Sequence, residues 1–387
     1  MANGVFTKGD GTTLNPYIIE DEYDLDKVRE NPSANYSIIK NIDVLNICNK
    51  NGAEGWEPIA DFSGILEGNG HIIKNLTINR TSDDSVGLFS SIRGGAIINL
   101  GIRNATVSGK DYVGGLIGSM SANDDLIENC FVTGSIIGNN YSGGIVGSFT
   151  SGTIINSFAE GTVTSTYYCG GIAGYMYGTN AYIKNSYAAC TCNSNNTSGI
   201  KGLASYVQSS FVGNIINSFY DNTLCFNDTT SEGKLSTQDM KKEATFTSWR
   251  NQYYSFDKPV WVFKNDSYPQ LYYLENTKYV VFVNNEYKTF KGNAWNTVSK
   301  TFPDEASFET HGMTDLELYE IPRYKWNELR QYKTFELIAS TDKFAIERKT
   351  IRKKMEVDSQ YASCVVLKAE LNLDQIGDSI NRIRIVH

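Results

Sequence analysis

The chain has 387 residues, of which 41% are hydrophobic and 20% charged, and it carries 34 glycines but only 7 prolines. This length can bury a sizeable core, and the composition excludes a disordered, collagen-like or proline-rich chain. The net charge of −8 makes nucleic acid a poor partner. The first residues lack the basic and apolar regions of a signal peptide, and no stretch approaches about 18 continuous apolar residues, so we expect no membrane insertion.

The glycines divide the chain into two parts. Residues 1–275 contain 31 glycines and residues 276–387 contain 3, so we predict two different structures that meet near residue 275. The predicted segments are an N-terminal cap (1–45), an array of coils (46–232), a closing cap (233–275) and a C-terminal β-rich module (276–387).

The first predicted element is a short helix over residues 20–31. Its acidic residues come early, its basic residues come late, and Leu25 and Val28 lie on one side. This pattern is typical of an amphipathic helix. We expect the helix to cover the first coil of the repeats that follow.

A pattern of about 28 residues recurs in the middle of the chain. Apolar and polar residues alternate within each copy, as in the segment from Ile154 to Thr164, and β-branched and aromatic residues are frequent. This pattern predicts short strands. Because one such unit cannot bury its apolar face alone, we predict that each copy is one coil of a parallel β-solenoid. The recurring asparagines are Asn99, Asn129, Asn156, Asn185 and Asn217. The glycines taken as equivalent are Gly87, Gly115, Gly144, Gly171 and Gly199.

Both recurring residue types have a structural interpretation. Glycine suits a corner that needs positive φ, or a place where neighbouring coils approach closely. Asparagine at one position per coil can form a hydrogen-bonded stack along the axis, or it can occupy left-handed turns. The sequence leaves these alternatives open.

The closing segment and the C-terminal module follow the repeats. Ser236 or Thr237 is expected to cap a short helix, before a segment that runs from Trp249 to Trp261. Beyond residue 276, strands are predicted at 279–283, 286–290, 334–339 and 364–371. A basic cluster near the C-terminus is interpreted as a solvated face, and docking to an acidic partner or an anionic cell-wall polymer is the alternative. Its residues are Arg348, Lys349, Arg352, Lys353 and Lys354.

Two parts of the chain resemble known families. The element Val113-Gly-Gly-Leu-Ile-Gly and its copies resemble the GLUG repeat of bacterial surface adhesins, which implies a right-handed parallel β-helix. The two predicted short helices would be its caps. This resemblance covers about residues 9–275. Residues 276–387, with Trp295, Gly312-Met313 and Trp326 in order, resemble a small β module of tail fibre proteins from phages and prophages.

No constellation of residues points strongly to catalysis. Asp84 and Asp111 are 27 residues apart, so they could be neighbours on adjacent coils and act as a carboxylate pair in glycan hydrolysis, but turn chemistry is the better interpretation. The three histidines, His71, His311 and His387, are far apart and predict neither a metal site nor a cofactor.

The cysteines are interpreted as interior residues. Cys190 and Cys192 lie on one face of a strand, and Cys169 comes one repeat earlier. A soft-metal or disulfide site is the alternative. Exposed tyrosines, with pairs such as Tyr167-Tyr168, suit contact with carbohydrate or protein.

The two resemblances lead to a functional hypothesis. We predict a non-enzymatic structural or receptor-binding component of a phage tail or phage-like particle, located in the virion. Expected partners are other tail proteins and a glycan or protein of the host surface, and the chain is expected to form a homo-oligomer, for which a trimer is one form. The first alternative is a tailspike-type polysaccharide depolymerase. The second alternative is a bacterial cell-surface adhesin.

Overall fold

The computed structural model describes most of the chain up to residue 249 and shorter stretches beyond it. The described residues are 6, 8–207, 214–226, 228, 233–249, 253–255, 258–264, 266–271, 277–283, 286–291, 294–297, 334–341, 354–357, 367–368 and 382–386. After residue 249, side chains are described only for 260–264 and 266–271. The chain divides into two compact units, the first with residues 1–250 and 261–271, the second with 251–260 and 272–387.

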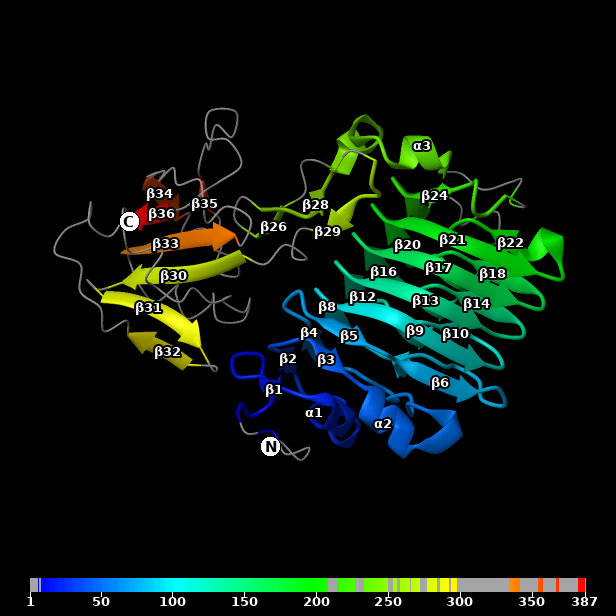
Figure 1. Cartoon of the computed structure of the whole chain (residues 1–387), viewed down its shortest axis with the longest axis horizontal. Coiled ribbons are helices and arrows are strands. Elements are labelled where there is room, and N and C mark those ends of the chain that lie inside the picture. Colours follow the sequence, from blue (N-terminus) through cyan, green and yellow to red (C-terminus); the bar gives the residue numbers. More distant parts are fainter. Residues whose placement is uncertain are drawn as a thin grey trace. The chain divides into compact units, whose positions relative to one another are not determined.

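The first unit is a parallel β-solenoid of about six turns (Figure 1). Each complete turn passes through sheets A, B, D and C in that order. Sheet A contains β1 (Tyr17–Ile19), β2 (Tyr36–Ile38), β4 (Ile65–Glu67), β8 (Ala96–Ile98), β12 (Leu126–Glu128), β16 (Gly152–Ile155), β20 (Ala181–Lys184) and β23 (Ile215–Ile216). Sheet B contains β3 (Ile42–Asp43), β5 (Ile72–Lys74), β6 (Thr77–Arg80), β9 (Gly101–Gly109), β13 (Phe131–Ile137), β17 (Phe158–Ser165), β21 (Tyr187–Ser194), β24 (Phe219–Asp221) and β25 (Lys234–Leu235).

The two remaining sheets of the solenoid are shorter. Sheet C contains β7 (Phe89–Ile92), β11 (Ile117–Met120), β15 (Val146–Phe149) and β19 (Ala173–Met176). Sheet D contains β10 (Val113–Gly114), β14 (Tyr141–Gly143), β18 (Tyr168–Gly170) and β22 (Ile200–Lys201). The mostly-β, parallel-solenoid fold that the repeats predict is therefore confirmed.

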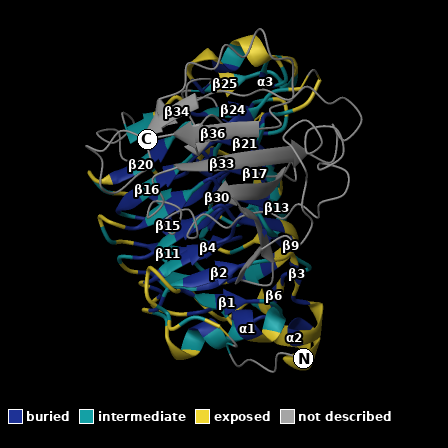
Figure 2. Cartoon of the chain, turned by 90° about the vertical axis from the view of Figure 1, so that its left-hand side faces the viewer, coloured by how far each residue is buried: buried dark blue, intermediate teal, exposed yellow. Residues whose placement is uncertain are grey.

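Parallel pairing in register places identical residue types above one another in the core. In sheet A, the pairing aligns four isoleucines from successive coils, all with 0% exposure: Ile97, Ile127, Ile154 and Ile183. A buried isoleucine contributes about 1.5–3 kcal/mol through the hydrophobic effect. Figure 2 shows the result, with buried strands inside and exposed residues mostly in turns and caps.

The recurring asparagines adopt both of the arrangements that their spacing suggests. All five are aligned by the register of sheet A and have φ between 47° and 57°. Along the axis, Asn129 Nδ2 donates to Asn99 Oδ1 at 2.9 Å, and Asn99 Nδ2 donates to Glu67 Oε1 at 2.7 Å. The column therefore combines left-handed turns with a short ladder of buried hydrogen bonds.

The predicted equivalence of the glycines is wrong at Gly199. Gly115, Gly144 and Gly171 do align, because the residues before them pair in sheet D. Gly87 lies beside Gly115 in the register of the Phe89–Ile117 pair and beside Gly114 in that of the Val86–Val113 bridge. The pairing of β18 with β22, however, places Gly199 beside Tyr168. The double glycine accounts for the one-residue change of register at Gly87, and a 3-10 turn, η3 (Thr197–Gly199), shifts the register at Gly199.

The aligned glycines serve close approach rather than positive φ. A Cβ on Gly171 would lie 2.3 Å from the carbonyl oxygen of Gly202 in the next coil. None of the five predicted glycines is among the described glycines with positive φ. Of the two proposed roles, contact between coils is therefore the one they fulfil.

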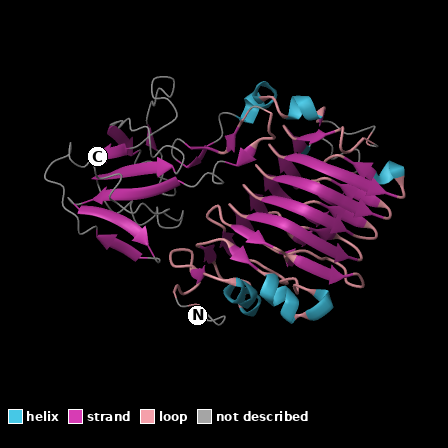
Figure 3. Ribbon diagram, in the orientation of Figure 1, coloured by secondary structure: helices cyan, strands magenta, loops and turns pink. Residues whose placement is uncertain are grey.

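Short helices lie at the ends of the solenoid (Figure 3). The predicted N-terminal helix is confirmed by α1 (Glu22–Lys27) and the 3-10 helix η1 (Val28–Glu30), with Leu25 and Val28 buried. Two further elements, α2 (Leu45–Lys50) and η2 (Gly52–Glu54), were not expected, and sheet A already begins within the segment predicted as a cap. Ser236 caps α3 (Thr237–Met240), which η5 (Glu243–Trp249) follows. Across the described residues, no helix is long and apolar enough to cross a bilayer.

Beyond residue 250 the described strands pair mainly in an antiparallel manner. Three predicted strands are confirmed by β30 (Thr277–Val283), β31 (Glu286–Lys291) and β33 (Thr334–Thr341). The other strands are β26 (Tyr253–Ser255), β27 (Lys258–Pro259), β28 (Trp261–Val262), β29 (Gln270–Leu271), β32 (Ala294–Thr297), β34 (Lys354–Val357), β35 (Leu367–Lys368) and β36 (Arg382–Val386). The structure describes only β35 within the strand that is predicted at 364–371.

Several predicted residues lie outside the described part of the chain. They are Arg348, Lys349, Arg352, Lys353, Cys364, His311 and His387. Lys354 begins β34, but its side chain is not described.

His71 gives a prediction for the acid stability of the solenoid. Burial lowers the pKa of this imidazole from 6.5 to about 4, so the folded state resists protonation while the unfolded state accepts a proton. We expect the free energy of unfolding to fall by about 1–3 kcal/mol from this group as the pH drops from about 6.5 to 4. Urea unfolding at both pH values should show a smaller fall for His71→Gln; an equal fall would contradict the prediction.

Candidate binding surface: a tyrosine patch

A column of tyrosines lies at the turn between sheets B and D. Pairing of Val86 with Val113, of β10 with β14 and of β14 with β18 aligns the residues that precede the Gly-Gly elements. This pairing aligns Val86, Val113, Ser142 and Cys169. The residues directly before them are Ser85, Tyr112, Tyr141 and Tyr168. One position earlier, the same register aligns Asp84, Asp111, Asn140 and Tyr167. An aromatic column and a mainly polar column therefore run side by side along the axis.

The rings of the aromatic column are stacked. The centroids of Tyr112 and Tyr141 are 5.3 Å apart with an interplanar angle of 4°, and those of Tyr141 and Tyr168 are 5.1 Å apart at 8°. These separations are close to the strand spacing of about 4.8 Å. The backbone repeat therefore fixes the stack, and little side-chain freedom remains to be lost when a ligand binds.

Three more tyrosines from sheet C and its extension join this stack. Bridges of Ala173 with Ala204 and of Met176 with Val207 place Tyr206 beside Tyr175, with centroids 5.1 Å apart. Tyr175 meets Tyr141 edge-on at 5.0 Å, and Tyr206 meets Tyr168 edge-on at 5.3 Å. Tyr177 stacks on Tyr175 at 5.9 Å. We call these six residues the tyrosine patch: Tyr112, Tyr141, Tyr168, Tyr175, Tyr177 and Tyr206.

The tyrosine patch is accessible and is built at a cost to backbone stability. Tyr177 and Tyr206 are each 45% exposed, and the other four are partly exposed. Tyr112 and Tyr206 have φ of 58° and 47°, a left-handed conformation that costs a bulky residue about 1–2 kcal/mol. Strain of this kind is concentrated at functional sites. Burial raises the pKa of Tyr141 and Tyr175, so both hydroxyls stay protonated near neutral pH.

The two aspartates considered for catalysis lie in the polar column. The register places Asp84 and Asp111 at equivalent positions of adjacent coils. Lys110 Nζ lies 3.2 Å from Asp84 Oδ1, and Asn140 Nδ2 donates to Asp111 Oδ1 at 2.7 Å. Each carboxylate therefore has a partner of its own at the turn. Asp111 and Asn140 directly precede Tyr112 and Tyr141, so the backbone of the polar column runs beside that of the aromatic column.

The cysteines follow the interior interpretation. The six described cysteines are all buried and free, so the disulfide alternative for Cys190 and Cys192 is wrong. Burial raises the pKa of the Cys190 thiol, which keeps it in the neutral form that suits a core. In the part of the chain that the structure describes, no three His, Cys, Asp or Glu side chains form a group suited to a metal ion.

Most members of the tyrosine patch were missed by the sequence analysis. Of the tyrosines that the sequence singles out, Tyr168 belongs to the patch and Tyr167 is exposed beside it. A signal for the column was present, because Tyr112, Tyr141 and Tyr168 each stand two residues before a Gly-Gly pair. Tyr175 and Tyr206 gave no such signal, because only the fold brings sheet C next to the turn.

Comparisons with known proteins find similarity over part of the chain. No protein-family model matches, so the finer resemblances to GLUG repeats and to a phage-tail module stay predictions. The chain is 33% identical over 144 residues to halomucin of Haloquadratum walsbyi, which is 34% of this chain and 2% of halomucin. It is 34% identical over 142 residues to a proposed Gly-rich membrane protein of Evansella cellulosilytica, which is 34% of this chain and 16% of that protein. The chain thus spans a small part of each relative.

Two solved structures are also similar. One is a proposed immunoglobulin A1 protease from Bacteroides ovatus, with a TM-score of 0.48 and 18% identity over 69% of this chain and 95% of that chain. The other is named as an IgA1 protease, with a TM-score of 0.39 and 18% identity over 51% of this chain and 19% of that chain.

Proposed function

We propose that the protein is a non-enzymatic adhesin that acts at a cell surface and attaches to its target through the tyrosine patch. The observation that carries the proposal is the patch itself, with six clustered rings held by a rigid solenoid. Tyrosine is enriched at recognition surfaces because it supplies contact area at a low cost in conformational entropy. The similarity to a relative that is named as a membrane protein is consistent with a location at the surface.

This proposal takes up the second alternative that the sequence suggested. The phage-tail hypothesis depended in part on the resemblance of residues 276–387 to a tail fibre module, and the side chains of these residues are not described. Neither of the two curated relatives is named as a phage protein. The polar column offers partnered turn aspartates, which suit a binding surface better than a carboxylate pair poised for hydrolysis.

A cell-binding assay tests the proposal. The purified chain, labelled with a fluorophore, is incubated with a panel of fixed bacterial and epithelial cells. We expect binding to at least one cell type, and a fall of at least about tenfold in affinity for the double variant Tyr175→Ala/Tyr206→Ala, because central aromatic contacts each contribute about 1–2 kcal/mol.

The matched control is Tyr182→Ala. Tyr182 lies on sheet A, is partly exposed and packs against Lys184 outside the patch. This variant should bind as the wild type does, and circular dichroism should show that all variants are folded. Equal binding by the double variant and the wild type, or no binding to any cell type, would overturn the proposal.

A further inference from the structure

We infer that the tyrosine patch and the adjoining side chains of Asp111 and Asn140 bind a neutral glycan, whose sugar rings follow one another along the solenoid axis. This inference rests on the proposed function and names the class of ligand for the same surface.

The chemistry of the surface matches that of a sugar chain. A pyranose ring presents C–H groups on its faces and hydroxyl groups around its rim. The rings of the aromatic column cover one another's faces and present their edges, and the partly exposed rings of Tyr175, Tyr177 and Tyr206 add further aromatic surface for the C–H groups. Beside them, the carboxylate of Asp111 can accept from a sugar hydroxyl, and the amide of Asn140, which already donates to Asp111 at 2.7 Å, retains its carbonyl oxygen as an acceptor.

Charge favours a neutral ligand over an anionic one. The tyrosine patch contains no charged side chain, and Asp111 in the next column is acidic. The cation nearest in sequence is Lys110, which pairs with Asp84 at 3.2 Å. An anionic polymer would therefore face Asp111 and find the charge of Lys110 already compensated.

The size of the patch favours a glycan over a folded protein. Six partly exposed tyrosines present on the order of 400 Å², if each ring offers about a third of its surface. A stable protein–protein interface buries about 800 Å² on each partner. The patch is therefore about half as large as a protein partner needs, whereas it suits a narrow chain.

The arrangement along the axis favours a repeating ligand. The aromatic column repeats at 5.3 and 5.1 Å, once per coil. A partner that extends along the axis meets the same type of ring at each step.

The inference is tested on the cells that bind the full chain. One portion is treated with periodate, which cleaves vicinal diols of sugars, and another with proteinase K. We expect periodate to reduce binding at least about tenfold and proteinase K to leave it within about twofold. Loss of binding after proteinase K but not after periodate would overturn the glycan inference, although the adhesin proposal would stand.

Native gels that contain a polysaccharide give an independent readout. The neutral polymers are dextran, mannan and β-glucan, and the anionic polymer is polygalacturonate. We expect at least one neutral polymer to retard the chain and polygalacturonate not to retard it. Asn140→Ala should raise Kd about five- to tenfold, since it removes a hydrogen-bonding side chain worth about 1 kcal/mol.

Asn193→Ala is the control for the gels, because Asn193 is an exposed asparagine of β21 outside both columns. It should bind as the wild type does. Retardation by the anionic polymer alone would refute the inference. It would also be refuted if no polymer retards the chain and binding to cells resists periodate.

Discussion

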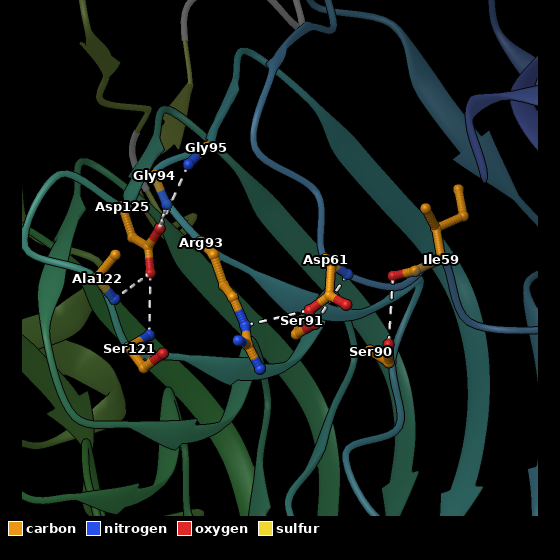
Figure 4. Close-up of polar contacts among 10 residues, drawn as sticks. All are labelled: Ile59, Asp61, Ser90, Ser91, Arg93, Gly94, Gly95, Ser121, Ala122 and Asp125. Atoms are coloured by element: carbon orange, nitrogen blue, oxygen red, sulfur yellow. Dashed lines mark hydrogen bonds and ion pairs between the residues drawn. The ribbon is translucent and has the colours of Figure 1, made fainter. Parts of the chain in front are cut away.

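Replacement of Asp125 by alanine is expected to lower the free energy of unfolding by about 3–5 kcal/mol. Asp125 is 1% exposed, and its carboxylate joins two successive turns at the corner between sheets C and A (Figure 4). Its Oδ1 accepts from the amides of Gly94 and Gly95, at 2.5 and 3.3 Å, in the preceding coil. Its Oδ2 accepts from the amides of Ser121 and Ala122, at 2.9 and 2.7 Å.

The large effect follows from the four backbone donors that would lose their acceptor. Burial raises the pKa of the Asp125 carboxyl, while the amide hydrogen bonds oppose this change by favouring the charged form. Asp125→Asn retains one oxygen as an acceptor, but its NH₂ group faces two backbone amide donors. We therefore expect this variant to lose at least half as much free energy of unfolding as the alanine variant loses.

Arg93→Ala is the control for Asp125. Arg93 Nε lies 3.1 Å from Asp61 Oδ1 in the same corner (Figure 4), but these side chains are 69% and 64% exposed. An exposed ion pair contributes about 0–1 kcal/mol. Urea unfolding followed by circular dichroism should therefore place Arg93→Ala close to the wild type; a similar loss in both variants would refute the role of the buried carboxylate.

Asn129→Ala is expected to cost about 2–4 kcal/mol. Asn129 is 1% exposed with φ of 52°, and its amide donates to Asn99 Oδ1 at 2.9 Å. Alanine would lose this buried hydrogen bond and would also adopt the left-handed conformation at a cost of about 1–2 kcal/mol. The two contributions can be separated by experiment.

Two variants separate them. Asn129→Gly tolerates the positive φ, so it should recover about 1 kcal/mol of the loss but not the hydrogen bond. Asn104 has φ of 59° and is exposed, so Asn104→Ala should report the conformational cost alone, about 1 kcal/mol. Equal stability of Asn129→Ala and Asn104→Ala would show that the ladder contributes nothing.

The repeat made the architecture predictable because strand type and burial are set locally in each coil. Alternation in segments such as Ile154–Thr164 indicates strands, and the asparagine spacing indicates their order along the axis. Exact register was harder to predict, because a double glycine and the 3-10 turn before Ile200 each permit an offset that only pairing resolves. The pairing aligns Gly199 with Tyr168, whereas the repeat spacing predicts that it aligns with Gly171.

The candidate surface was only partly predictable, for a different physical reason. The tyrosines before the Gly-Gly pairs share one sequence position and could be found by alignment of the copies. Tyr175 and Tyr206 lie at a different position of the repeat, and their contacts with Tyr141 and Tyr168 cross from one sheet to another. Asp125 also escaped notice, since nothing in the pair Asp124-Asp125 shows which carboxylate is buried.

The contacts of Tyr175 set a minimum size for the functional unit. Tyr175 reaches Tyr141 one coil earlier and Tyr112 two coils earlier, at 6.2 Å, while Tyr206 belongs to the coil that follows. The structural repeat is thus a single coil, but the surface exists only where four consecutive coils are present. Gain or loss of coils outside residues 112–206 would change the length of the solenoid and leave the tyrosine patch intact, whereas removal of one coil within this range would remove tyrosines from it.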